Sequence, residues 1–227
     1  LTYLDCSHNA LTGLDVTSNT LLTFLNNSTN AITNLDVSAN TALEILFCYQ
    51  NNLTTLDLSQ NTALAELHCG SNQLTSLNIS VNTALTYVYC AYNSITSLDL
   101  SQNTALLDFD CSFNVTLTSL NVQNGNNTSL TSFLVIGVPL LTCIQVDNVS
   151  YMNTNWASNV DPQAQFRRYT GGGHVRRLDR RRLGGRLLPQ RIDPGRGLHR
   201  VDARLGAAVH DEAAPDHEVA ERRGPHD

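Results

Sequence analysis

Cysteine is the residue of this 227-residue chain best suited to chemistry, and five of its six cysteines share one position of a regular spacing. They are Cys6, Cys48, Cys69, Cys90 and Cys111, with Asn27 in the one gap. Successive turns of a stacked chain would hold such thiols about 5 Å apart with parallel Cα–Cβ directions, a poor geometry for disulfides. A free, buried cysteine packs like a small apolar residue. We therefore interpret the column as core filling, with a metal or redox site as the alternative.

Histidine beside a carboxylate is the other arrangement that could do chemistry. Glu66 and His68 are two residues apart, and no nucleophile or metal-ligand spacing surrounds them or His8. An isolated pair of this kind is typical of surfaces without catalysis. We expect no enzymatic activity, no catalytic residue, no metal and no cofactor.

An acidic column invites a calcium interpretation. It consists of Asp15, Asp36, Asp57, Asn78 and Asp99. One carboxylate about every 4.8 Å is sparse for an ion that takes six to eight oxygens, so we favour a solvated edge. Regular threonines beside this column raise ice binding as a further alternative, which the acids disfavour.

These columns follow from a 21-residue repeat that begins at Leu1, Leu22, Leu43, Leu64, Leu85 and Leu106. The shared pattern is LxxLxCxxNxLTxLDLSxNTA, and only the sixth unit gains residues. Each unit is called a coil below. Alternation predicts one strand with Leu46 and Cys48 inward and a second with Leu56 and Leu58 inward. Two Asn columns follow these strands and predict ladders that bind turn backbone. Coils this short must stack to bury their apolar side chains.

The pattern resembles the leucine-rich repeat family, signature LxxLxLxxNxL, and more narrowly its 21-residue class of secreted bacterial proteins. The resemblance covers residues 1 to about 146. It implies a right-handed, parallel-strand-rich solenoid with little or no helix, and a short strand in both halves of each coil. It also implies secretion or display on the cell surface, and a role in binding. Residues 153–166 resemble the closing cap of such proteins. In look-alikes a cysteine placed like Cys143 pairs with one beyond the cap, and no such cysteine follows here.

The composition changes abruptly at Arg167. Residues 1–166 contain eleven acids and no Lys or Arg, and all 14 basic residues are arginines from Arg167 onward. We divide the chain into a solenoid (1–152), a cap segment (153–166) and an Arg/Gly-rich tail (167–227) that we predict to be disordered or translated out of frame. Phosphate binding by the arginines of 176–186 is the alternative, but acids are interspersed and aromatics are scarce, so no nucleic-acid partner is expected. No apolar run is long enough to cross a membrane.

The outward positions of the two halves of each coil differ in composition. The second-half face contains the acidic column, which is flanked by Thr and Ser except at Gly13 and Asn34, and has no aromatic residue. The first-half face runs from Tyr3 and Asp5 in coil 1 to Asp108 and Asp110 in coil 6 and is rich in aromatics. Exposed aromatics are enriched where proteins bind partners, although they also favour strands.

We therefore predict a non-catalytic extracellular or cell-surface module that binds a protein, or a glycan, through the first-half face, with a ligand-free spacer as the alternative. Gly70, between Tyr49 and Ala91, would leave a shallow dent in this face. The predicted ligand-binding residues are Phe47, Tyr49, Glu66, His68, Tyr87, Tyr89 and Tyr92.

Overall fold

A computed structural model describes residues 1–169 of the chain. The predictions of disorder, out-of-frame origin or phosphate binding for the tail fall almost wholly on residues 170–227 and lie outside the described residues. Within residues 1–169, the few helices are all too short to cross a membrane.

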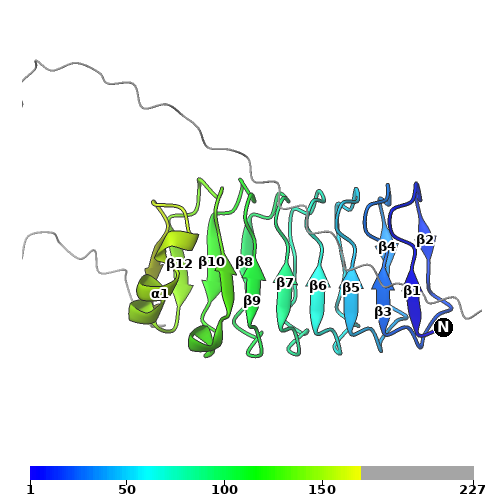
Figure 1. Ribbon diagram of the computed structural model, residues 1–227, viewed down its shortest axis with the longest axis horizontal. Coiled ribbons are helices and arrows are strands. Elements are labelled where there is room, and N and C mark those ends of the chain that lie inside the picture. Colours follow the sequence, from blue (N-terminus) through cyan, green and yellow to red (C-terminus); the bar gives the residue numbers. More distant parts are fainter. Residues whose placement is uncertain (170–227) are drawn as a thin grey trace, which may run out of the picture. The chain divides into compact units, whose positions relative to one another are not determined.

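One parallel sheet contains a strand from the first half of each of the six coils and of a final coil that begins at Leu130 (Figure 1). In spatial order its strands are β1 (Tyr3–Asp5), β3 (Phe24–Asn26), β5 (Ile45–Phe47), β6 (Glu66–His68), β7 (Tyr87–Tyr89), β9 (Asp108–Asp110) and β11 (Ser132–Leu134). Equivalent residues of successive coils are paired, for example Leu46 with Leu67 and Leu67 with Val88. These paired side chains are completely buried, so the alternation read from the sequence is confirmed.

The second halves of the coils form strands less regularly. They are β2 (Leu14–Asp15) paired with β4 (Leu35–Asp36), and a sheet of β8 (Ser97–Asp99), β10 (Ser119–Val122) and β12 (Cys143–Val146), which β13 (Gln165–Arg167) of the closing segment extends. Coils 3 and 4, residues 43–84, contain no second-half strand, contrary to what the resemblance implies. Leu56 and Leu77 of these coils are still buried, with 8% and 6% exposed. Burial of the apolar side chains thus keeps the chain direction even where backbone pairing is not formed.

Asparagine side chains tie each coil to the one before it. Asn61 Nδ2 donates to the carbonyl oxygens of Val37 and Asn40 at 3.0 and 2.9 Å. In the other column, Asn72 Nδ2 donates to Cys48 O at 3.0 Å and Asn72 Oδ1 accepts from the amide of Leu53 at 3.0 Å. Both predicted Asn ladders are confirmed, and they satisfy backbone groups that bends would otherwise leave buried without a partner.

The cysteine column lies inside the solenoid. Cys48, Cys69, Cys90 and Cys111 are free and buried, and burial raises the pKa of each thiol. Core filling is therefore confirmed for these four residues. Cys143 is half-buried and off the column, as predicted.

The last coil is closed by a helical segment and a final strand. Helix α1 (Val149–Asn155) begins where Asn148 Oδ1 accepts from the amide of Tyr151, and the 3₁₀ turn η2 (Ala157–Asn159) follows; another, η1 (Asn127–Ser129), lies in coil 6. Strand β13 then pairs with β12 and buries Phe166. These elements extend from Val149 to Arg167 and include the segment 153–166 that we predict as the cap.

Candidate functional site

Five of the seven predicted site residues project from neighbouring strands of the first-half sheet. They are Phe47 on β5, Glu66 and His68 on β6, and Tyr87 and Tyr89 on β7. The residues between them, Leu46, Leu67 and Val88, are buried, so the named side chains point outward. The rings of Phe47, His68 and Tyr89 form one column, in which both neighbouring pairs of ring centroids are 4.5 Å apart. We call these three residues the aromatic column.

The remaining two predicted residues follow strands rather than lie on them. Tyr49 lies just after β5 and is half-buried. Tyr92 is 56% exposed and stacks on Phe113, with ring centroids 4.4 Å apart. Both Tyr92 and Phe113 have positive φ, 56° and 57°, a conformation that bulky residues rarely adopt. Tyr92 thus belongs to a separate aromatic pair at the border of the face.

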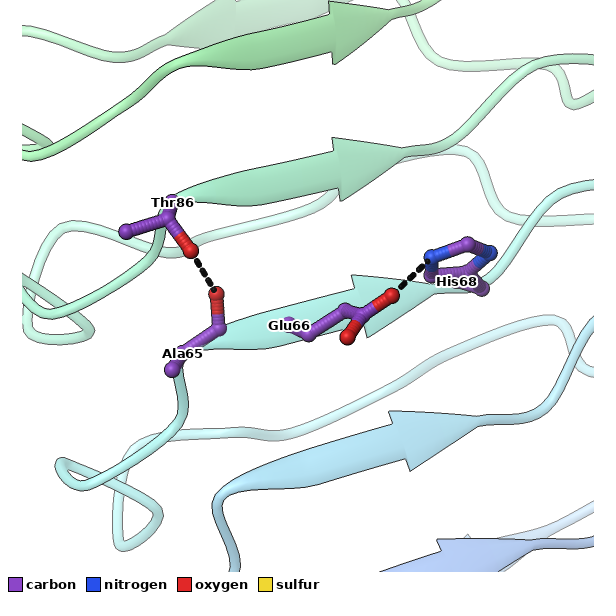
Figure 2. Close-up of polar contacts among 4 residues, drawn as sticks. All are labelled: Ala65, Glu66, His68 and Thr86. Carbon is purple, nitrogen blue, oxygen red and sulfur yellow. Dashed lines mark hydrogen bonds and ion pairs between the residues drawn. The ribbon is translucent and has the colours of Figure 1, made fainter.

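Glu66 and His68 form the polar contact of the site (Figure 2). The distance from His68 Nε2 to Glu66 Oε1 is 2.8 Å, and the Thr86 hydroxyl donates to Ala65 O at 3.0 Å, which ties β6 to the next coil. Burial lowers the pKa of His68, and this effect outweighs the opposite effects of Glu66 and Asp108. His68 is therefore neutral at pH 7 and bonded to a carboxylate, and no nucleophile lies in this contact.

The aromatic column replaces a turn-capping device that other coils keep. In coils 1, 2 and 6 the equivalent residues are Asp5, Asn26 and Asp110, and each Oδ1 accepts from the backbone amide two residues later, at 3.0, 3.2 and 2.8 Å. With Phe47, His68 and Tyr89 in this position, the amides of Tyr49, Gly70 and Ala91 have no acceptor within residues 1–169. Three adjacent coils thus leave three equivalent donors without a partner on the outer face. Sequence reasoning missed this feature, although the change from Asx to aromatic residues in one column was its signal.

The second-half face keeps the same device in every coil. Oδ1 of Asp15, Asp36, Asp57, Asn78, Asp99 and Asn121 accepts from the amide of the residue two positions later. Hydrogen bonds from Thr17, Ser38 and Ser59 lower the pKa of Asp15, Asp36 and Asp57. The acidic column therefore has a local structural role. Residues 1–169 contain no group of three or more His, Cys, Asp or Glu placed to hold a metal ion.

Gly70 is explained by close packing. A Cβ on Gly70 would lie 3.0 Å from the carbonyl oxygen of Ala91 in the next coil, tighter than most such contacts. A hollow of about 260 Å³ lies instead on the second-half face, between coils 3 and 4, which have no second-half strand. It is lined by Thr55, Leu56, Asp57, Ser59, Ser76, Asn78 and Val81. The first-half site is thus a surface of rings and polar groups.

Comparison with known proteins identifies the fold. No family model and no curated protein matches the chain. Among solved structures, the functional domain of InlJ from Listeria monocytogenes, which includes a cysteine ladder, is 27% identical over 73% of this chain and 52% of its own, with a TM-score of 0.38. An internalin, InlF, from Listeria monocytogenes is 20% identical over 73% of this chain and 47% of its own, with a TM-score of 0.56.

A leucine-rich repeat protein of Leptospira interrogans, LIC12759, is 17% identical over 72% of this chain and 59% of its own, with a TM-score of 0.39. The chain spans about half the length of the two Listeria structures. Three observations indicate the same fold: the 21-residue repeat, the stacked parallel strands and the likeness to the fold of InlF. The chain therefore has the leucine-rich repeat fold seen in InlF, with a repeat of 21 residues.

Proposed function

We propose that this chain is a non-catalytic extracellular or cell-surface module that binds a partner protein through the first-half face. The binding surface consists of Phe47, Tyr49, Glu66, His68, Tyr87 and Tyr89, with Tyr92 at its border. The proposed location rests on the resemblance to secreted bacterial leucine-rich repeat proteins.

The loss of turn caps in three consecutive coils carries the proposal. A net intramolecular hydrogen bond is worth roughly 0.5–1.5 kcal/mol, and coils 3, 4 and 5 each lack one that the second-half face keeps. Residue choices that oppose local stability concentrate at functional sites. The replacement of turn caps by the aromatic column is confined to one face and to adjacent coils. This distribution supports the proposal that these residues were selected for binding.

Aromatic side chains have the properties of interface anchors. They bury a large area with few rotatable bonds and dominate the energetics of many interfaces. Tyr87 is 39% exposed, and the rings of Phe47 and Tyr89 lie on either side of His68. This arrangement offers a continuous apolar strip with carboxylates at its edge, which suits a protein surface.

The test replaces each residue of the aromatic column by asparagine, the residue that caps the equivalent turn in coil 2. A Phe47→Asn/His68→Asn/Tyr89→Asn variant would restore acceptors for the amides of Tyr49, Gly70 and Ala91, as Asn26 does for Ser28. The matched control is Thr55→Ala/Ser76→Ala/Ser97→Ala on the second-half face. Each labelled protein is applied to an array of purified extracellular protein domains, and its affinity for every domain bound by the wild type is measured.

We expect the capped variant to lose at least about thirtyfold in affinity, equivalent to 2 kcal/mol, while the control is unchanged. Its free energy of unfolding should fall by no more than about 1 kcal/mol, because the new hydrogen bonds offset the lost ring contacts. Rings that only pad strands would give the opposite result: a clear loss of stability and no change in binding. The proposal would likewise be contradicted if only the control variant lost affinity for the domains that the wild type binds.

A further inference from the structure

We propose that the partner of the first-half face presents a basic segment, whose Arg or Lys side chain lies between Tyr89 and the carboxylates of Asp108 and Asp110. Backbone carbonyls of the same segment would accept from the three uncapped amides of Tyr49, Gly70 and Ala91. This inference rests on the proposed function of the face and specifies the chemistry of its partner.

The carboxylates of β9 are half-buried, and within residues 1–169 neither of them forms a salt bridge. Asp108 and Asp110 alternate on this strand, facing outward beside β7, where they pair with Tyr87 and Tyr89. Burial is the largest effect on the pKa of Asp110 and raises it, repulsion from Asp108 adds to this, and the hydrogen bonds with Ser112 oppose it without cancelling it. Asp108 Oδ1 is buried and has no hydrogen-bond partner within residues 1–169. Removing carboxylates from water is unfavourable unless a cation or hydrogen bonds compensate, so a bound cation would be stabilised here.

No basic side chain of the solenoid can supply this cation. Residues 1–166 contain neither Lys nor Arg, against eleven acids. Arg167 lies in the cap and its Nη2 donates to Gln165. The charge that complements Asp108 and Asp110 must therefore come from outside the solenoid, which makes charge complementarity the basis of the partner assignment.

The rings beside these carboxylates favour a guanidinium or ammonium group. Tyr89 is the neighbour of Asp110 across β7 and β9, and Tyr87 is the neighbour of Asp108. A cation over an aromatic face is attracted by its quadrupole, and a guanidinium can stack on a ring while donating to a carboxylate. Glu66 precedes Tyr87 in the same outward row and adds a third negative charge to the site.

The uncapped amides decide between a basic polypeptide and an anionic partner. The equivalent amides of Ser7, Ser28 and Ser112 donate to side chains on the outer face, so these N–H groups point to the partner side. They need acceptors, but a phosphate or carboxylate would meet Glu66, Asp108 and Asp110 and be repelled. A neutral carbonyl oxygen next to a basic side chain satisfies donors and carboxylates together, and a polypeptide provides both.

The experiment measures binding of two synthetic peptides to the full chain by fluorescence anisotropy. One labelled peptide contains five Arg–Ser repeats, and its twin has citrulline, the neutral isostere, in place of every Arg. We expect the Arg peptide to bind at least tenfold more tightly than its twin. The Asp108→Asn/Asp110→Asn variant should bind the Arg peptide at least tenfold more weakly than the wild type. The Asp57→Asn/Asp99→Asn variant has the same charge change on the second-half face, and its affinity for the Arg peptide should change less than twofold.

Equal losses in both double variants would overturn the inference, because they would reveal attraction to overall charge only. The same titrations are repeated with Arg176, Arg177, Arg180, Arg181, Arg182 and Arg186 changed to Gln, which removes a competing basic segment of the chain itself. Peptide binding seen only in that background would identify the chain's own segment as the occupant and overturn the partner assignment. One outcome separates this inference from the proposed function. If the domains bound on the array lose affinity for the aromatic-column variant but not for Asp108→Asn/Asp110→Asn, and the chain does not bind the Arg peptide, the proposed function stands and this inference is contradicted.

Discussion

The strands of both outward faces are followed by a turn that an Asp or Asn side chain can cap, yet the two faces differ in how many of these turns are capped. On the second-half face an Asp or Asn caps the turn in six successive coils, from Asp15 to Asn121. On the first-half face the cap is present in coils 1, 2 and 6 and is replaced by Phe47, His68 and Tyr89 between them. Because a repeat protein carries its own internal control, a local departure from the repeat indicates function more clearly than composition does.

The largest effect is expected beneath the faces. Leu67→Ala, below the aromatic column, should lower the free energy of unfolding by about 2–5 kcal/mol through lost transfer energy and a cavity. Leu77→Ala, below the second-half face, should cost less within that range, because Leu77 is 6% exposed and outside any strand. Urea denaturation of both variants measures this difference. A cost below about 1 kcal/mol for Leu67→Ala would mean that inward and outward positions have been exchanged.

Removing a cap from the second-half face should have an intermediate effect. Asp99→Ala deprives the amide of Ser101 and the side chain of Asn121 of their acceptor and should cost about 1 kcal/mol. Asp57→Asn keeps an acceptor, as Asn78 does, and relieves repulsion from Asp36, so it should lower the melting temperature much less than Asp99→Ala does. Calorimetry of the two variants provides the comparison. An equal loss of stability in the two variants would show that the charge, rather than the hydrogen-bond acceptor, holds these turns.

The smallest effect is a difference in titration between the faces. Hydrogen bonds with Ser59 lower the pKa of Asp57, so its contribution to stability is present above the usual Asp range and is lost as pH falls through the lowered value. Burial raises the pKa of Asp110, so its contribution is present below the usual range and is lost as pH rises through the raised value. Carboxyl-carbon NMR titration should place Asp57 below 3.8 and Asp110 above it. The reverse order would contradict the difference in burial between the carboxylates of the two faces.

Much of the fold could be predicted because the repeat imposes the same environment on equivalent residues. The inward direction of Leu46 and Cys48 and the bonding of Asn61 and Asn72 follow from alternation and from the needs of bent backbone. The strands absent from coils 3 and 4 could not be predicted, since Leu56 and Leu77 fit the pattern of every other coil and nothing in the sequence distinguishes these two coils. The uncapped amides were missed because they are set by a hydrogen bond between residues two apart, a relation that composition of a face does not contain. The stacking of Tyr92 on Phe113 likewise depends on a left-handed backbone that neither residue type suggests.

The asparagine ladders have a consequence for the thermodynamics of recognition. Asn61 joins the backbone of its coil to two carbonyls of the coil before it, and Asn82 and Asn103 repeat the connection along the axis. A coil cannot open without breaking buried bonds on both sides, so neighbouring coils should unfold cooperatively as one block. Rings carried by such a block lose little conformational entropy when a partner arrives, and more of their contact energy remains as affinity.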